Sequence, residues 1–182
     1  NVTGIDYSHF FIDKANNENE LANLRYQHCD MRDEYPSRPY EAIVNFFTSF
    51  GYFEDDKENG LVLFQVRKAL IENGWFMLDF LNEEYVRQTL VPKSIKELSG
   101  AIVTEKRKID GKFVVKDITI EVEVNNKVMK FQERVRLYNL QELKQLHIAN
   151  ELQIKECFGN YNGGEFVPSH SPRLILFSRP IS

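Results

Sequence analysis

Cysteine is scarce in this 182-residue sequence, and long apolar runs are absent from it. Its two cysteines, Cys29 and Cys157, are too few for a disulfide framework and lack the spacing of metal ligands. No apolar run approaches the ~20 residues that a membrane-spanning helix requires. Residues 1–6 have neither the basic region nor the apolar stretch of a signal peptide. We therefore expect a cytoplasmic protein with reduced thiols, no metal site and no membrane association.

The sequence also lacks a surplus of basic residues. It has 23 Lys and Arg against 27 Asp and Glu, which gives a formal net charge of −4. Such a chain cannot neutralise many phosphates, so we expect no nucleic-acid partner. Hydrophobic residues make up 42% and charged residues 27%, the balance of an ordinary globular domain. The length suits one domain with a modest appendage.

Apolar segments alternate with amphipathic segments in the first half of the chain. Strands are predicted over residues 2–5, 24–29, 42–47 and 75–80. Helices are predicted over residues 9–16, with Ser8 as the N-cap, and 59–73, with Gly74 as the stop. The inward stripe of the second helix would consist of Leu61, Leu63, Phe64, Val66, Leu70 and Ile71. Continuous apolar strands between helices indicate a parallel sheet that is covered on both faces.

The middle of the chain, residues 101–138, is typical of an antiparallel meander. Ile118 and Ile120 belong to a period-two alternation, and Asp110–Gly111 and Asn125–Asn126 are hairpin signals. A helix over residues 141–150 and strands over 153–158 and 173–177 follow. We predict an α/β fold, a doubly wound and mostly parallel sheet with an inserted antiparallel β-meander. Its parts would be a core over 1–82, an inserted helix and sheet over 83–138, and the completion of the core over 139–182.

Polar side chains stand where four of the predicted strands end, and ligands of open parallel sheets bind beyond these carboxyl ends. They are Asp6, Asp30, Asn45 and Asp79. The carboxylate of Asp6 could accept hydrogen bonds from both hydroxyls of a ribose, or it could cap a turn. Asp30 could accept from the amine of an adenine while Met31 packs on the ring. The alternative for Asp30 is an ion pair with Arg32 or Arg38.

The order of these pieces resembles the class I S-adenosylmethionine-dependent methyltransferases, in particular the small-molecule branch with the amino-sugar N-methyltransferases. The matching segments cover nearly the whole chain; they are residues 2–8, 29–33, 45–53, 73–79, 135–138 with Glu142 and Leu143, and 171–176. The resemblance implies that S-adenosylmethionine is the cofactor. Its binding residues would be Asp6, Tyr7, Asp30, Met31, Asn45 and Phe46.

The resemblance implies roles for several parts of the chain. Asp6 would hold the ribose, and Asp30 with Met31 the adenine. Residues 45–47 would face the methionine moiety and the reaction centre, and the meander would cover the substrate. Residues 1–82 would then be a partial cofactor-binding core. The family's loop Asp/Glu-x-Gly-x-Gly-x-Gly, which follows its first strand, does not occur in the sequence. We therefore expect a fragment without that strand, or a relic that lost cofactor binding, and the start inside a strand without a methionine favours the fragment.

Substrate contacts are predicted at two places. Phe50 and Tyr52 could line a substrate pocket or belong to the core. Arg136 or Tyr138 could contact an anionic substrate, and a structural pair of Arg136 with Glu142 is the preferred alternative. The four histidines are scattered, so no catalytic base is assigned.

Three functions are compatible with this pattern. The leading hypothesis is methyl transfer from S-adenosylmethionine to an N or O atom of a small molecule. The second is a non-catalytic, methyltransferase-like binding module. The third is a dinucleotide-dependent oxidoreductase, in which the run Asp-Met-Arg-Asp at residues 30–33 would have no role. Edge strands of the meander offer surfaces for a homodimer.

Overall fold

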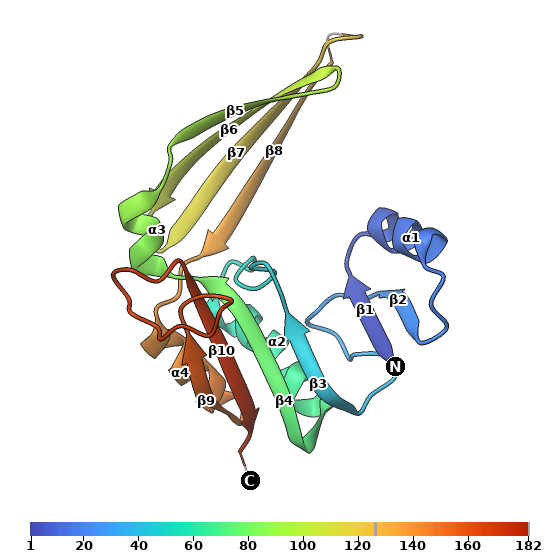
Figure 1. Cartoon of the computed structure of the whole chain (residues 1–182), viewed down its shortest axis with the longest axis vertical. Helices are drawn as coiled ribbons and strands as arrows, with labels where there is room; N and C mark the ends of the chain where they lie inside the picture. Colours follow the sequence, from blue (N-terminus) through green and yellow to red (C-terminus); the bar gives the residue numbers. More distant parts are fainter. Residues whose placement is uncertain (126, 182) are drawn as a thin grey trace.

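The computed structural model describes residues 1–125 and 127–181, and within them the strands form three sheets (Figure 1). The first pairs β1 (Val2–Asp6) with β2 (Leu24–His28), and the second has the order β3 (Tyr40–Asn45), β4 (Leu70–Leu81), β10 (Arg173–Pro180), β9 (Leu152–Phe158). The third is the meander β5 (Lys93–Leu98), β6 (Ala101–Asp110), β7 (Phe113–Val122), β8 (Lys127–Arg136). The helices are α1 (His9–Glu18), α2 (Asp56–Ala69), α3 (Glu83–Thr89) and α4 (Leu140–Ala149).

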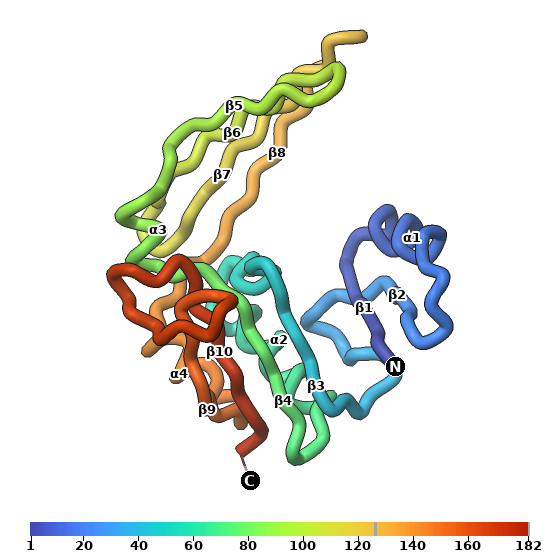
Figure 2. The backbone as a smooth tube through the Cα atoms, viewed as in Figure 1, coloured from blue at the N-terminus to red at the C-terminus, as the bar shows by residue number. Residues whose placement is uncertain are grey.

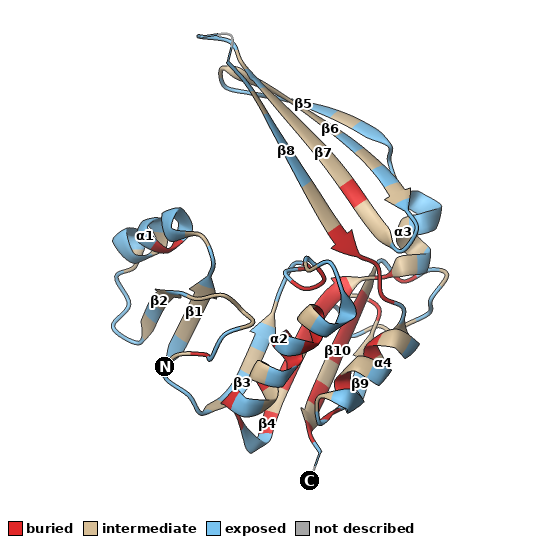
Figure 3. Ribbon diagram, turned by 180° about the vertical axis from the view of Figure 1, so that it is seen from behind, coloured by how far each residue is buried: buried red, intermediate tan, exposed pale blue. Residues whose placement is uncertain are grey.

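The core sheets combine parallel and antiparallel pairs, which confirms the predicted α/β fold with an antiparallel insertion. β1 is parallel to β2 and β3 to β4, whereas β10 is antiparallel to both β4 and β9. β1, β2 and α1 lie beside β3 in views from opposite sides (Figures 1 and 3). No ladder joins β1 to β3 in the described part of the chain, so each of these strands has one open backbone edge.

The hydrophobic core lies between the four-stranded sheet and the helices α2 and α4, which cover one of its faces (Figure 3). Side chains of α2 contribute to it, but with a different stripe from the predicted one. The buried apolar residues are Val62, Leu63, Val66 and Ala69, while Leu61 and Phe64 are exposed. The prediction is confirmed for Leu63 and Val66 and wrong for Leu61 and Phe64. The helix begins three residues earlier than predicted, where the Asp55 side chain caps it, and ends at Ala69, so Leu70 and Ile71 belong to β4.

Gly74 lies within β4 and does not end α2, which corrects the predicted helix stop. A Cβ atom at this position would stand 2.9 Å from a methyl carbon of Leu70 and 3.2 Å from the carbonyl oxygen of Glu41 in β3. The register between β3 and β4 shifts at the same place, between Tyr40 and Ala42. Glycine is therefore needed for the close approach of the two strands.

The meander projects away from the core sheets (Figure 2). The turn between β6 and β7 contains Gly111 at φ 57°, as the Asp110–Gly111 signal predicts. Asn126, in the second predicted turn, lies outside the described residues. A strand that the sequence did not indicate, β5, precedes the meander's predicted start and pairs with β6. None of the described helices combines the length and hydropathy needed to cross a bilayer.

Candidate functional site

Asp6 ends β1 with an exposed carboxylate. Its Oδ1 accepts a hydrogen bond from the backbone N–H of Ser8 at 2.7 Å, and Ser8 in turn caps α1. Tyr7 beside it is 71% exposed. The turn that caps the helix therefore leaves this carboxylate accessible from outside, next to an accessible aromatic ring.

Two histidines extend the aromatic surface near Asp6. The rings of His9 and His28 stack with their centroids 3.7 Å apart, and the ring of Tyr7 lies 5.6 Å from that of His28. Sequence reasoning placed the histidines apart because one begins α1 and the other ends β2. The parallel pairing of Asp6 with His28 brings them together.

Asp30 forms the ion pair that the sequence offered as an alternative to adenine binding. Its carboxylate accepts hydrogen bonds from Arg32 Nε at 3.1 Å and Nη2 at 2.7 Å, which lower the pKa of Asp30. Arg32 also donates to Glu58 of α2 at 2.9 Å and lies 4.2 Å from the ring centre of Phe53. Arg38 pairs with Glu34 instead. The contact between Arg32 and Glu58 therefore joins the segment after β2 to α2.

The end of β3 presents a polar atom without a protein partner. Asn45 Oδ1 is buried, and no hydrogen-bond donor reaches it within residues 1–125 and 127–181. The next two side chains, Phe46 and Phe47, are exposed, and their ring centres lie 5.7 Å apart. A buried acceptor beside exposed aromatic rings is suited to a bound organic molecule.

Asp79 is fully buried in β4, two residues before the strand ends, and it binds the loop after β3. Its Oδ2 accepts from the Phe47 N–H at 2.9 Å and from the Tyr161 hydroxyl at 2.8 Å, which raises the pKa of Tyr161. Its Oδ1 accepts from Arg173 Nε at 2.7 Å, and Arg173 Nη2 donates to Thr48 Oγ1 at 2.9 Å. Sequence reasoning placed Asp79 at a strand end but missed Arg173, which is 94 residues away.

Phe50 is a core residue, which corrects its predicted place in a substrate pocket. The side chain has no exposed surface and packs with its ring centre 6.0 Å from that of Phe80 and 5.8 Å from that of Tyr138. Tyr52 remains 46% exposed. Partial burial raises its pKa, and the nearby carboxylate of Glu133 in β8 adds to this shift.

Arg136 and Tyr138 are also buried, and their polar groups bind other side chains. Arg136 Nη2 donates to Glu142 at 2.8 Å, which is the structural pair that the sequence favoured. The Tyr138 hydroxyl donates to Asp56 at 2.6 Å. Neither side chain reaches a surface on which a substrate could bind, so the predicted contact with an anionic substrate is corrected.

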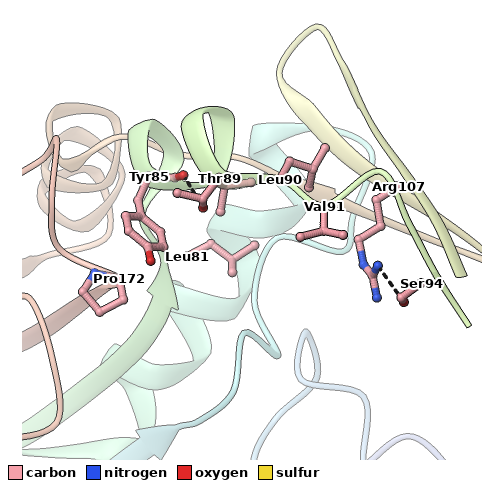
Figure 4. Close-up of a pocket in the computed structure, with 9 residues that line it drawn as sticks. Leu81, Tyr85, Thr89, Leu90, Val91, Ser94, Arg107 and Pro172 are labelled. Carbon is pink, nitrogen blue, oxygen red and sulfur yellow. Dashed lines mark hydrogen bonds between the residues drawn. The ribbon is translucent and has the colours of Figure 1, made fainter. Parts of the chain in front are cut away.

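A surface cleft of about 480 Å³ lies between α3, the base of β5 and β6, and the residue that precedes β10 (Figure 4). Its apolar lining consists of Leu81, Tyr85, Val86, Leu90, Val91 and Pro172. Arg107 stands at one end, where it donates to Ser94 Oγ at 3.1 Å and pairs with Glu105. No local pattern in the sequence indicates this cleft, because its walls come from three separate segments. Among the described residues, no cluster of three or more His, Cys, Asp or Glu side chains could hold a metal ion.

The chain is similar over nearly its whole length to solved methyltransferases. An S-adenosylmethionine-dependent methyltransferase from Clostridium acetobutylicum superimposes with a TM-score of 0.85 at 16% identity, over 100% of this chain and 76% of that one. The CcbJ methyltransferase from Streptomyces caelestis gives 0.82 at 16% identity, over 99% and 74%. The sugar N-methyltransferase KedS8 from a Streptoalloteichus species gives 0.74 at 13% identity, over 99% and 71%.

The chain has the methyltransferase fold. No protein-family model and no curated protein matches the sequence. Because the identities are low, the likeness to solved methyltransferases shows the fold alone. It confirms the fold that the sequence resemblance implied. In this methyltransferase fold, Asp6 and Asn45 are the last residues of β1 and β3, and Asp30 lies two residues beyond β2. Asp79 lies within β4, two residues before its end at Leu81, so β4 is longer than the predicted strand.

Proposed function

We propose that this chain binds S-adenosylmethionine and serves methyl transfer to an N or O atom of a small molecule. Asp6 and Tyr7 would bind the ribose, and Asn45 with Phe46 the methionine moiety. Met31 would pack on the adenine, and Asp30 would accept from its amine through the lone pair of Oδ2 that the pair with Arg32 does not use. The arrows of β1, β3 and β4 point toward the same end (Figure 1), so Asp6, Asn45 and Asp79, which stand at or near the ends of these strands, lie toward one edge. The observation that carries the proposal is the unpartnered, buried Asn45 Oδ1 at that edge.

The residues at this edge suit the chemistry of methyl transfer. S-adenosylmethionine, when bound, supplies a methyl group on a positively charged sulfur. The protein must hold the acceptor in line with that methyl group and exclude water. The exposed rings of Phe46 and Phe47 offer apolar surface for this purpose, and Tyr52, in the loop that follows, is partly exposed. The cleft beside α3 offers room for a small acceptor molecule.

We further propose that another parallel strand pairs with the open edges of β1 and β3 and carries a Gly-rich loop toward the cofactor. The sequence of 182 residues contains no such loop. Two strands of like direction with open edges are suited to a strand between them. This strand would come from a segment outside residues 1–182.

The absence of the Gly-rich loop also favours a second function, a methyltransferase-like module that binds a partner without chemistry. The sequence encoded upstream of residue 1 distinguishes the enzyme from the binding module. A segment with Asp/Glu-x-Gly-x-Gly-x-Gly supports the enzyme, since glycines let the backbone approach the cofactor. Its absence supports the module.

The role of Asp6 is tested by Asp6→Asn in the protein that is expressed from its complete reading frame. We expect the affinity for S-adenosylhomocysteine to fall, because an amide offers one acceptor where the carboxylate offers two. Asp13→Asn, an exposed position on α1, is the matched control and leaves the affinity unchanged. Equal affinities for Asp6→Asn and wild type would show that this residue does not hold the ribose.

A further inference from the structure

Two consecutive residues in the loop after β3 have left-handed backbone conformations. Phe47 has φ 56° and Thr48 has φ 63°. Non-glycine residues rarely adopt this region, because the Cβ atom crowds the following carbonyl oxygen. Such a turn persists only where its surroundings hold it in place.

Asp79 provides that hold through both backbone N–H groups of the turn. The Phe47 N–H donates to Asp79 Oδ2 at 2.9 Å, and the Thr48 N–H donates to the Asp79 carbonyl oxygen at 3.2 Å. Arg173 binds both Asp79 and Thr48. Its Nε donates a hydrogen bond to Asp79 Oδ1, and its Nη2 donates one to Thr48 Oγ1. The turn is therefore held by three hydrogen bonds: one to the Asp79 carboxylate, one to the Asp79 backbone carbonyl and one from Arg173 to Thr48.

The turn holds the exposed aromatic rings in a fixed position on the surface. Phe47 is 80% exposed although its backbone is bound to a fully buried residue. Its position is set by the turn, since solvent surrounds most of the ring. Asn45 and Phe46, the residues that we assign to the methionine moiety, stand directly before the turn and depend on its direction.

We propose that Asp79 and Arg173 are positioning residues, which clamp the left-handed Phe47–Thr48 turn and thereby fix Asn45, Phe46 and the Phe47 ring at the cofactor edge. The effect on cofactor binding rests on the proposed function. The clamp itself rests on the geometry alone. Neither Asp79 nor Arg173 needs to touch a ligand in this role. Tyr161 adds a further donor to the carboxylate without binding the turn.

The clamp is tested by stability in the protein expressed from its complete reading frame. Phe47→Gly and Phe47→Ala both remove the exposed ring, but only glycine adopts a positive φ without strain. With Asp79 present, we expect a higher urea midpoint for Phe47→Gly than for Phe47→Ala. In the Asp79→Asn background the turn relaxes, and this advantage shrinks or reverses. An equal advantage in both backgrounds would overturn the clamp. Where Asp79→Asn does not fold, Arg173→Lys, which keeps the charge but loses the forked contact, takes its place with the same expectation.

The positioning role is tested by calorimetric titration of S-adenosylhomocysteine into the protein from its complete reading frame. Asp79→Asn, or Arg173→Lys in its place, is expected to weaken binding by about tenfold or more, as misplaced contact groups do. Tyr161→Phe, which removes one donor to the same carboxylate and leaves the turn bound, is the matched control with near wild-type affinity. Unchanged affinity in the clamp variant would overturn positioning and leave a purely structural pair. If the wild type does not bind, the proposed function fails, and the stability comparison still decides the clamp.

Discussion

The hydroxyl of Tyr138 donates a hydrogen bond to Asp56 Oδ1 at 2.6 Å, across 82 residues of sequence. Tyr138 follows the last strand of the meander, and Asp56 is the first residue of α2. Arg136 Nε lies 3.4 Å from the same oxygen. These contacts join the base of the meander to the helix that covers the core sheet, so the two parts of the molecule share one polar joint.

Removing the hydroxyl at this joint should weaken the fold. Tyr138→Phe leaves the ring in the core and deprives Asp56 of a donor, which is expected to lower the free energy of unfolding by about 1–2 kcal/mol. Urea unfolding measures the change. Tyr7→Phe, at an exposed position, is the control and should stay close to wild type. A Tyr138→Phe protein as stable as the wild type would contradict the role of the joint.

The same joint should make the protein sensitive to acid through Glu142. Burial raises the pKa of Glu142, but hydrogen bonds from Arg136 and Lys112 outweigh it and lower the pKa to about 2. The stabilisation is present above the ordinary carboxyl pKa of about 4.5 and is lost as the pH falls toward 2. Urea midpoints measured across this range should fall for the wild type and change less for Glu142→Gln. If the urea midpoints of the wild type and of Glu142→Gln fall in parallel with pH, this assignment is refuted. Glu18→Gln, at an exposed position, serves as the control.

His147 should contribute a second, separate pH dependence. The ring is fully buried on α4, its Nδ1 lies 2.7 Å from the Leu143 carbonyl oxygen, and burial lowers its pKa to about 4. The unfolded chain takes up a proton near pH 6.5, so stability is complete above that pH and declines as the pH falls toward 4. His147→Phe should flatten the urea midpoint between pH 6.5 and 4, whereas His170→Gln, in an exposed loop, should not. An unchanged slope in His147→Phe would contradict the prediction.

Local signals in the sequence were sufficient for much of the fold. Ser8 caps α1 as predicted, and the Asp110–Gly111 turn joins β6 to β7. β5 could not be predicted because its mostly exposed residues lack a period-two alternation. The position of a candidate residue was predictable where it depends on a strand end, as for Asp6 at the end of β1. It was not predictable where it depends on distant partners, as between Asp79 and Arg173.

Phe50 and Tyr52 illustrate the same limit within one loop, and they predict opposite mutational effects. Both are aromatic and two residues apart, but only Phe50 is fully buried. Phe50→Ala is expected to lower the free energy of unfolding by about 3–5 kcal/mol. Tyr52→Ala should cost much less, because its ring is 46% exposed. Urea unfolding measures the free energy of unfolding of the two variants. Similar decreases for both would contradict the assignment of Phe50 to the core and of Tyr52 to the surface.

Calorimetric titration of S-adenosylhomocysteine tests the central claim most directly. The protein expressed from its complete reading frame is titrated beside the 182-residue chain. We expect micromolar binding to the former and weaker or no binding to the latter, because the proposed strand and Gly-rich loop between β1 and β3 complete the cofactor site. No binding to either protein would contradict the methyltransferase function and favour a binding module.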